Sequence, residues 1–178
     1  MWQFWIDTGG TFTDCLARTP EGEELRVKVL SNAAIRGRVV EVLGPRRLRV
    51  ELGLSVKDDF FDGYGFCLHG SESKAIRITG WVSGTGVVGL DTDISSIETG
   101  TLCSIQSPEE PPTLAMRLLT EKRLDEILPP LELKLATTRG TNALLEGNGA
   151  RVAFFVTKGF GDLLRIGNQQ RPDLFELG

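Results

Sequence analysis

The sequence predicts an α/β domain that is interrupted by a small all-β module. Three observations predict this class: strand-like alternation over residues 1–35, short apolar runs between glycines over 36–107, and alternating strand and helix patterns over 108–178. We therefore expect the first part of the α/β domain at 1–35, the β-rich insert at 36–107 and the second part at 108–178.

The opening residues predict three antiparallel strands. Apolar and polar side chains alternate over residues 2–7, and residues 12–18 can return as a second strand. A Pro-Glu-Gly turn at 20–22 precedes a third alternating run at 25–30. The chain should therefore begin with a three-stranded meander.

The middle of the chain has the spacing of a small all-β module. Residues Arg47 to Leu52 and Ala75 to Val82 alternate, whereas Val87 to Leu90 and Leu102 to Ile105 are short apolar runs. Frequent glycines separate them, which is typical of short strands joined by tight turns.

The last third alternates between helix and strand patterns. Acidic residues and prolines at 108–112 suit a helix start, and apolar residues recur at helical spacing from Thr113 to Lys122. The segments that follow are expected as strand, helix, strand and helix at Leu131–Ala136, Asn142–Gly147, Arg151–Thr157 and Gly161–Ile166. This βαβα order predicts a sheet with crossover helices.

The charge balance argues against a nucleic-acid or anionic-membrane partner. The 178 residues include 20 Lys and Arg against 24 Asp and Glu, which gives a net charge of −4. Both kinds of partner require a basic face. The apolar stretches are too short to span a bilayer, and residues 1–7 lack the features of a signal peptide. We therefore expect a cytoplasmic protein.

The cysteines and the histidine form no recognisable metal or redox motif. Cys15, Cys67 and Cys103 are odd in number and far apart in sequence, so we expect reduced thiols. His69 is the only histidine, which disfavours a zinc site or a Ser-His-Asp triad. Carboxylates, hydroxyls, Arg, Lys and backbone amides must therefore carry any chemistry.

The most informative segment is Asp7–Asp14, at the predicted reversal between the first two strands. Gly9 and Gly10 allow positive φ there, and they let backbone N–H groups approach a ligand with no Cβ in the way. Phosphate oxygens bind in such cradles, and Thr11 and Thr13 would add hydroxyl donors. These four residues are candidate phosphate ligands.

Two carboxylates flank this hairpin. Asp7 and Asp14 could hold Mg²⁺ through water, because Mg²⁺ gives up its waters reluctantly. The pattern also fits a plain Gly-Gly turn between polar residues, and spacing alone slightly favours that interpretation. The segment is neither a Walker A loop nor a dinucleotide fingerprint, since no Gly-Lys-Thr/Ser and no helix pattern follow the glycines.

The strand-to-helix turn after Ala136 is a second candidate site. Thr and Asn cap helices well, and free N–H groups at a helix start attract anions. Arg139 could bind a carboxylate or phosphate with two hydrogen bonds, and Gly140 permits close approach. Taken alone, the segment is better explained as an ordinary turn with a Thr cap and a surface Arg. Two weaker candidates are the loops at 157–162 and 168–173.

Four segments, in this order, resemble the N-terminal region of the hydantoinase/oxoprolinase family. They are Trp2–Asp14, Ala136–Glu146, Thr157–Phe160 and Ile166–Phe175. The Trp-Gln-Phe-Trp opening and the Gly-Asn-Gln-Gln-Arg-Pro run are more similar to bacterial-type 5-oxoprolinases than to hydantoinases. Thr8 departs from the family pattern, in which Arg more often follows the first Asp, and this departure bears on the substrate.

The resemblance implies half of a ribonuclease-H/actin-like ATPase domain, a β-meander followed by βαβα, whose first hairpin wraps the ATP phosphates. The implied reaction converts 5-oxoproline, ATP and two waters into glutamate, ADP and phosphate through a phosphorylated amide. The implied cofactors are ATP and Mg²⁺, with K⁺ as a further candidate. The implied roles are phosphate binding by Gly9, Gly10, Thr11 and Thr13, Mg²⁺ binding by Asp7 and Asp14, and contact with substrate or the transferred phosphoryl group by Arg139, Thr141 and Asn142.

The resemblance also implies partners and leaves alternatives open. The expected partners are a small cyclic-amide substrate and the remainder of the enzyme, either a C-terminal half or a hydantoinase B-like subunit, with a homo-oligomer as the complete form. The chain itself is expected to be an inactive N-terminal piece. The alternatives are an ATP-dependent hydantoinase subunit and a non-catalytic assembly module. A sugar or acetate kinase shares the hairpin, but the segment at 136–142 argues against it.

Overall fold

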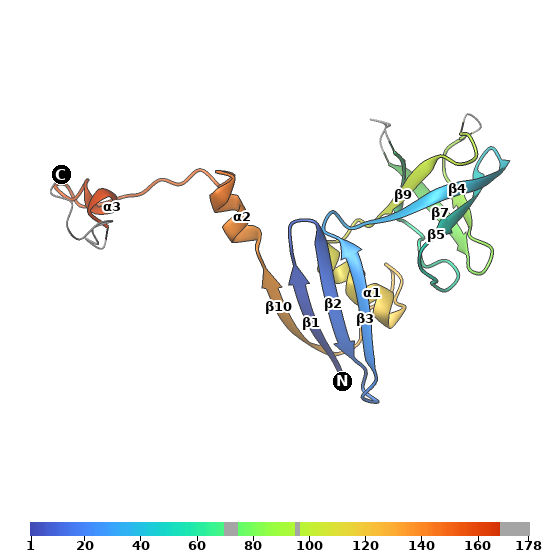
Figure 1. Ribbon diagram of the computed structural model, residues 1–178, viewed down its shortest axis with the longest axis horizontal. Helices are drawn as coiled ribbons and strands as arrows, with labels where there is room; N and C mark the ends of the chain where they lie inside the picture. Colours follow the sequence, from blue (N-terminus) through green and yellow to red (C-terminus); the bar gives the residue numbers. More distant parts are fainter. Residues whose placement is uncertain (70–74, 95–96, 168–178) are drawn as a thin grey trace, which may run out of the picture.

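The computed structural model describes residues 1–69, 75–94 and 97–167. The chain forms a mixed α/β structure with a four-stranded sheet in the order β10-β1-β2-β3 and a closed barrel in the order β4-β5-β8-β7-β6-β9 (Figure 1). The sheet carries the hairpin identified in the sequence, and the barrel interrupts the chain between β3 and α1.

The sheet begins with the predicted antiparallel meander. Its strands are β1 (Trp2–Thr8), β2 (Phe12–Arg18) and β3 (Glu24–Leu30). The fourth strand, β10 (Leu131–Thr137), pairs with β1 in parallel, from Trp2 opposite Leu131 to Thr8 opposite Thr137. Parallel neighbours need a long crossover, and here the crossover includes the whole barrel and α1.

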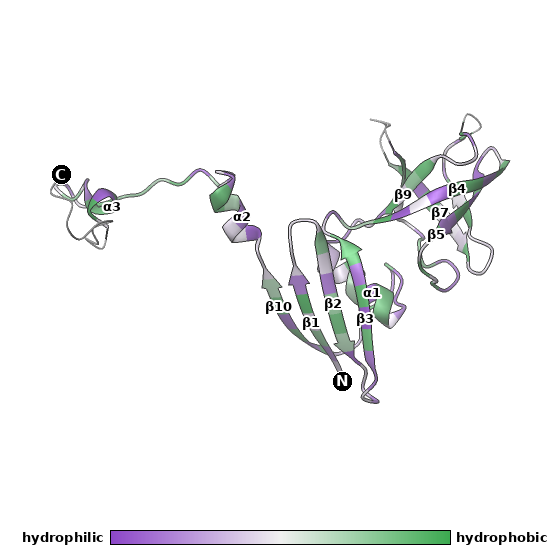
Figure 2. Cartoon of the chain, viewed as in Figure 1, coloured by the Kyte–Doolittle hydropathy of each residue, from purple (hydrophilic) through white to green (hydrophobic). Residues whose placement is uncertain are grey.

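The two faces of the sheet differ in what covers them. Alternation buries Phe4 and Ile6 of β1 and Cys15 and Ala17 of β2 on the face that packs against α1 (Pro111–Thr120). The opposite face carries charged and aromatic side chains, and Figure 2 shows the resulting alternation of hydrophobic and hydrophilic residues along these strands.

Helix α1 follows the signals predicted for it. Prolines occupy its first two positions, where no backbone N–H partner is needed. Leu114, Ala115 and Met116 are buried, and the helix ends where Glu121 takes a left-handed conformation with φ of 52°. The predicted helix is thus confirmed, with its bounds shifted by two residues.

The barrel consists of six strands, all paired antiparallel. They are β4 (Ala34–Gly44), β5 (Arg47–Leu52), β6 (Gly65–Leu68), β7 (Ile76–Val82), β8 (Val87–Leu90) and β9 (Leu102–Gln106). Four of them, β5, β7, β8 and β9, lie where strand patterns were predicted, whereas β4 and β6 were missed. The division of the chain into domains at 35 and 107 stays a prediction.

Four aromatic side chains form a cluster that joins the connection between β5 and β6 to Trp81 of β7. Phe61 packs edge-on against Phe60, Tyr64 and Trp81, with ring centroids 5.2, 5.4 and 5.0 Å apart. All four side chains are buried. Edge-to-face packing of this kind adds to the stability that burial alone provides.

Two charged side chains fasten the segment after α1. Arg117 is only 6% exposed, forms two hydrogen bonds to Glu109, and donates to the carbonyls of Arg123 and Glu126. Glu126 accepts from Lys57 in the barrel and from Lys122. These contacts hold together the segment between β9 and α1, helix α1 itself, and the segment between α1 and β10.

The chain after β10 differs from the prediction. Helices α2 (Arg139–Leu145) and α3 (Leu163–Ile166) form, close to where helices were expected. The strand predicted at 151–157 is wrong, because these residues are irregular and all exposed. A strand requires a neighbour for its backbone hydrogen bonds, and among the described residues no strand pairs with this run.

Candidate functional site

The hairpin between β1 and β2 is closed by a short backbone hydrogen bond. The N–H of Gly9 donates to the carbonyl of Phe12 at 3.0 Å. Neither Gly9 nor Gly10 has positive φ, so that expectation is wrong. Glycine suits position 9 for a different reason, because a Cβ there would lie 3.2 Å from the Phe12 oxygen, a tight approach that would push on the hairpin.

The tip of the hairpin presents unpaired donors. The N–H groups of Gly10 and Thr11 donate to no atom of the described residues. Both residues are exposed. Successive free N–H groups at a turn form an anion-binding cradle, so this tip has the donor chemistry that a phosphate oxygen requires.

A serine that the sequence analysis did not single out holds the base of the hairpin. The Ser31 Oγ donates to the carbonyl of Gly9 at 2.8 Å and lies 3.2 Å from Thr13 Oγ1. The Ser31 N–H donates to the carbonyl of Thr11 at 2.9 Å. Thr13 is completely buried, so its hydroxyl could reach a phosphate only if the Ser31 contact opened.

The start of α2 lies beside the hairpin. The N–H of Thr138 donates to the Thr8 carbonyl at 3.2 Å, and Asn142 Nδ2 donates to Thr138 Oγ1 at 3.3 Å. A Cβ on Gly10 would lie 3.5 Å from this same Nδ2. The two candidate segments of the sequence therefore meet, although about 130 residues separate them.

These contacts surround a hollow of about 680 Å³. Its lining includes Gly9, Gly10, Arg139 and Asn142 among the predicted site residues. Thr8 also lines it, and the Thr8 Oγ1 is buried with no partner among the described residues. A buried hydroxyl without a partner is costly, so a ligand that bonded to the Thr8 hydroxyl in this hollow would gain from it.

Arg139 is exposed and faces an acidic partner. Its guanidinium lies 3.6 Å from Glu110, with both side chains largely in water. Such a pair is weak, so it leaves the guanidinium available to a stronger anion. The expected Thr cap is not formed by Thr138; instead Thr137 Oγ1 accepts from the Arg139 N–H at 3.2 Å. Thr141 is exposed and is absent from the residues lining this hollow.

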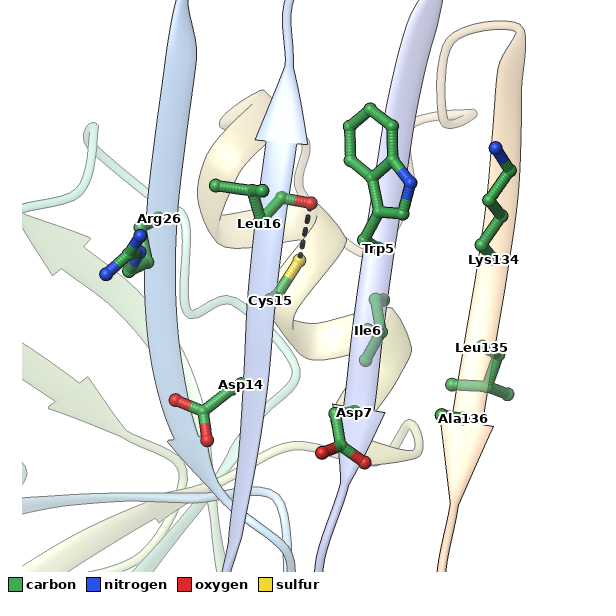
Figure 3. Close-up of a pocket in the computed structure, with 10 residues that line it drawn as sticks. All are labelled: Trp5, Ile6, Asp7, Asp14, Cys15, Leu16, Arg26, Lys134, Leu135 and Ala136. Carbon is green, nitrogen blue, oxygen red and sulfur yellow. Dashed lines mark hydrogen bonds between the residues drawn. The ribbon is translucent and has the colours of Figure 1, made fainter.

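Asp7 and Asp14 lie on the open face of the sheet. They are directly opposite one another across β1 and β2, and Figure 3 shows their carboxylates at the same end of a second hollow. Asp14 forms an ion pair with Lys28 at 3.0 Å. The two aspartates are thus adjacent, as a shared Mg²⁺ would require, but one of them is already partly neutralised.

The other end of this second hollow is aromatic and basic. Arg18 and Lys134 each lie 5.7 Å from the centroid of the Trp5 ring, and both distances suit cation–π contact. The two hollows share only Leu135 among their lining residues. The predicted site is therefore split by the sheet, with the carboxylates on one side and Arg139 and Asn142 on the other.

The remaining candidates do not join either hollow. Residues 157–162 are all exposed, and the polar run at 168–173 lies outside the described residues. Within the described ranges, no group of three or more His, Cys, Asp or Glu side chains could hold a metal. Burial raises the pKa of the Cys15 thiol to about 12, so this free cysteine is not a nucleophile.

Comparison with known proteins decides the family. The family profile described as "Hydantoinase/oxoprolinase N-terminal region" matches residues 85–178, more than half of the chain. The chain belongs to the hydantoinase/oxoprolinase family. The glycine hairpin lies outside the matched residues, so its interpretation rests on the contacts described above.

Relatives within the hydantoinase/oxoprolinase family match a short part of the chain. "5-oxoprolinase 1" of Arabidopsis thaliana is 62% identical over 45 residues, which cover 25% of this chain and 4% of the relative. The proteins named "5-oxoprolinase" in Dictyostelium discoideum and Saccharomyces cerevisiae are each 58% identical over 45 residues, with the same coverage. The matched part thus spans a small fraction of these relatives.

Two further findings complete the comparison. No solved structure matches the chain. In the part of the chain that the structure describes, no helix is long and apolar enough to cross a membrane.

Proposed function

We propose that this chain is the N-terminal part of an ATP-dependent 5-oxoprolinase, which hydrolyses the lactam of 5-oxo-L-proline to L-glutamate. The observation that carries the proposal is a hollow that Gly10, Asn142 and Arg139 line together, beside a hairpin tip where the Gly10 and Thr11 N–H groups are unpaired among the described residues. The family membership and the names of the relatives support the substrate class.

The chemistry of the reaction explains why such a site is useful. A lactam amide is stabilised by resonance and is a poor electrophile. ATP with Mg²⁺ would supply a phosphoryl group to the lactam oxygen and make the ring carbon open to attack by water. The protein then contributes positioning and charge stabilisation more than covalent chemistry.

The residues of this chain would divide that work. The N–H groups of Gly10 and Thr11 would orient phosphate oxygens, because both donors are free at the exposed tip of the hairpin. Arg139 would leave its weak contact with Glu110 and bind the transferred phosphoryl group or a substrate carboxylate. Asn142 would donate beside Gly10 through Nδ2.

The donor set on the open face suits a hydrated Mg²⁺. Asp7 and Asp14 offer two adjacent carboxylates with open solvent around them, and Mg²⁺ commonly keeps several waters when few protein ligands are present. Lys28 would have to release Asp14 before Asp14 could serve the ion with its full charge.

We further propose that the remainder of the enzyme covers this chain. The matched segment amounts to 4% of the relatives' length. Large apolar side chains after β10 lie in water, among them Phe155 at 91% exposed. The remainder could be a C-terminal half or a hydantoinase B-like subunit.

Phosphate release by the whole enzyme tests the proposed reaction. With Mg-ATP and K⁺ present, phosphate and glutamate should appear together when 5-oxoproline is added. Phosphate release that responds to a hydantoin but ignores 5-oxoproline would change the substrate and retain the mechanism. No response to any cyclic amide would favour a non-catalytic assembly module.

The Asp7→Asn substitution tests the metal site. It should lower turnover by about a hundredfold or more, because it removes a charge that would hold the metal. The thermal midpoint should stay unchanged, because Asp7 is exposed. Glu132→Gln is a matched control, since Glu132 is an exposed carboxylate on the same face, bonded to Gln3. Turnover that survives Asp7→Asn would remove Asp7 from the site.

A further inference from the structure

We propose that Ser31 is a positioning residue that sets the direction of the Gly10 N–H in the phosphate-binding hairpin. The inference rests on the proposed function of that hairpin. Ser31 follows the end of β3 and contacts three hairpin residues, through Gly9 O at 2.8 Å, Thr11 O at 2.9 Å and Thr13 Oγ1 at 3.2 Å. Ser31 also lines the hollow beside the hairpin.

The planarity of the peptide bond gives this contact its effect. In a trans peptide, the carbonyl of one residue and the N–H of the next point in opposite directions. No peptide bond of the described chain is cis. By holding the Gly9 carbonyl, the Ser31 hydroxyl therefore holds the Gly10 N–H pointing away from Ser31. A donor fixed in advance binds an anion without a cost for reordering.

A second hydroxyl supports the first. A serine hydroxyl has one proton, and Ser31 donates it to Gly9 O. Thr13 must then be the donor in its contact with Ser31 Oγ. The result is a chain of hydrogen bonds from Thr13 to Ser31 to the Gly9 carbonyl, in which each bond strengthens the next. Thr13 is 0% exposed, so its hydroxyl cannot contact a phosphate directly. Donating to Ser31 gives this buried hydroxyl an indirect role in phosphate binding.

Glycine at positions 9 and 10 makes the control by Ser31 necessary. These residues have no side chain that restricts their peptide plane, so the plane between them rotates easily unless something holds it. The Gly9 N–H bond to Phe12 fixes the preceding plane, and the Ser31 N–H bond to Thr11 fixes the plane that follows Thr11. The Ser31 hydroxyl holds the plane between Gly9 and Gly10.

The test is the affinity of the whole enzyme for Mg-ATP, measured by calorimetry, together with kcat and KM for each substrate. Ser31→Ala should weaken Mg-ATP binding about tenfold, the effect of losing one hydrogen bond of ordinary strength. The KM for the cyclic amide should stay within about twofold, because the proposal places phosphate and not the cyclic amide at this peptide. Ser31→Thr keeps the hydroxyl and should restore most of the affinity.

Thr13→Val and Ser55→Ala complete the set. Thr13→Val removes the supporting donor at nearly constant volume and should weaken Mg-ATP binding by a smaller factor than Ser31→Ala. Ser55→Ala alters an exposed serine on the barrel side and should change nothing.

The outcomes separate the two proposals. Equal affinity in the wild type and Ser31→Ala would overturn the role of Ser31 and leave the proposed function intact. A lower thermal midpoint in Ser31→Ala with unchanged Mg-ATP affinity would show a purely structural serine and would also overturn it. If the wild type binds no Mg-ATP, both proposals fail.

Discussion

At Gly86, two requirements for glycine coincide. Its φ is +67°, and a Cβ would lie 2.3 Å from the carbonyl oxygen of Val50, which belongs to the neighbouring strand β5. The same residues are joined by a hydrogen bond from the Val50 N–H to the Gly86 carbonyl at 2.8 Å. Nearby Gly84 has φ of +72° but open space around its Cβ position, so it shares only the first requirement.

Gly86→Ala and Gly84→Ala should therefore differ in cost. Gly84→Ala should lower the free energy of unfolding by about 1–2 kcal/mol, the strain of a left-handed alanine. Gly86→Ala should cost about 1–3 kcal/mol more, because backbone must move to admit the methyl group. Urea denaturation of the two variants checks this, and equal midpoints would show that β5 and the turn before β8 can separate freely.

Other residues show which features of the candidate site could be predicted from the sequence and which could not. The glycine pair at 9 and 10 was identified as special from its position, but the expected reason, positive φ, is wrong. The reason observed at Gly9 is close approach to Phe12, which is a property of the folded turn. Nothing in the sequence identified Ser31 as a site residue. Its partners are 18 to 22 residues away, and they meet it only because β3 pairs with β2 in the folded sheet.

Among the elements, strands marked by a strict period of two or by a short apolar run were predictable, and the irregular strand β4 was not. The meander and β10 lie where alternation placed them. Strand β4 was missed because its register shifts between Val39 and Glu41 and between Val42 and Gly44, which breaks the period. It also contains Gly37, where a Cβ would lie 2.6 Å from Leu52 and 2.8 Å from the Glu51 oxygen.

Glu126 connects two elements through its charge. It accepts hydrogen bonds from the Arg123 N–H, from Lys57 of the barrel side and from Lys122, and these bonds lower its pKa from 4.5 to about 2. The folded state thus favours the ionised carboxylate more than the unfolded state does. The stabilisation is fully present above pH 4.5 and is lost as the pH falls toward 2.

A Glu126→Gln variant should accordingly be less stable than the wild type at pH 7, and the difference should shrink as the pH falls from about 4.5 to 2. The measurement is the urea midpoint of both proteins across this range. Glu121→Gln serves as the control, since Glu121 is an exposed carboxylate that takes no part in these three hydrogen bonds. A difference that is constant with pH would show that the three donors do not act on the charge of Glu126.

Across the whole molecule, the sheet and barrel share one core while the tail has none. The buried cluster includes Phe4 in the sheet, Leu114 in α1 and Phe66 in the barrel. By contrast, every residue from 144 to 167 is exposed, and Figure 1 shows this segment extending away from the sheet. Local periodicity predicted a strand at 151–157, but a strand depends on a partner that sequence pattern alone cannot supply.

This contrast predicts the order of proteolysis. Trypsin should cut first after Arg151 and Lys158, because cleavage there needs no unfolding. Cuts after Arg47 and Arg49 in β5 should be slower by about a hundredfold or more, since they require the barrel to open at a cost of about 3 kcal/mol or more. Mass spectrometry of a time course identifies the fragments, and digestion in urea, where all four bonds should be cut together, is the control. Protection at Arg151 and Lys158 in native buffer would mean that the apolar run at 151–157 packs against another surface, so the tail would then have to be assigned to a folded unit.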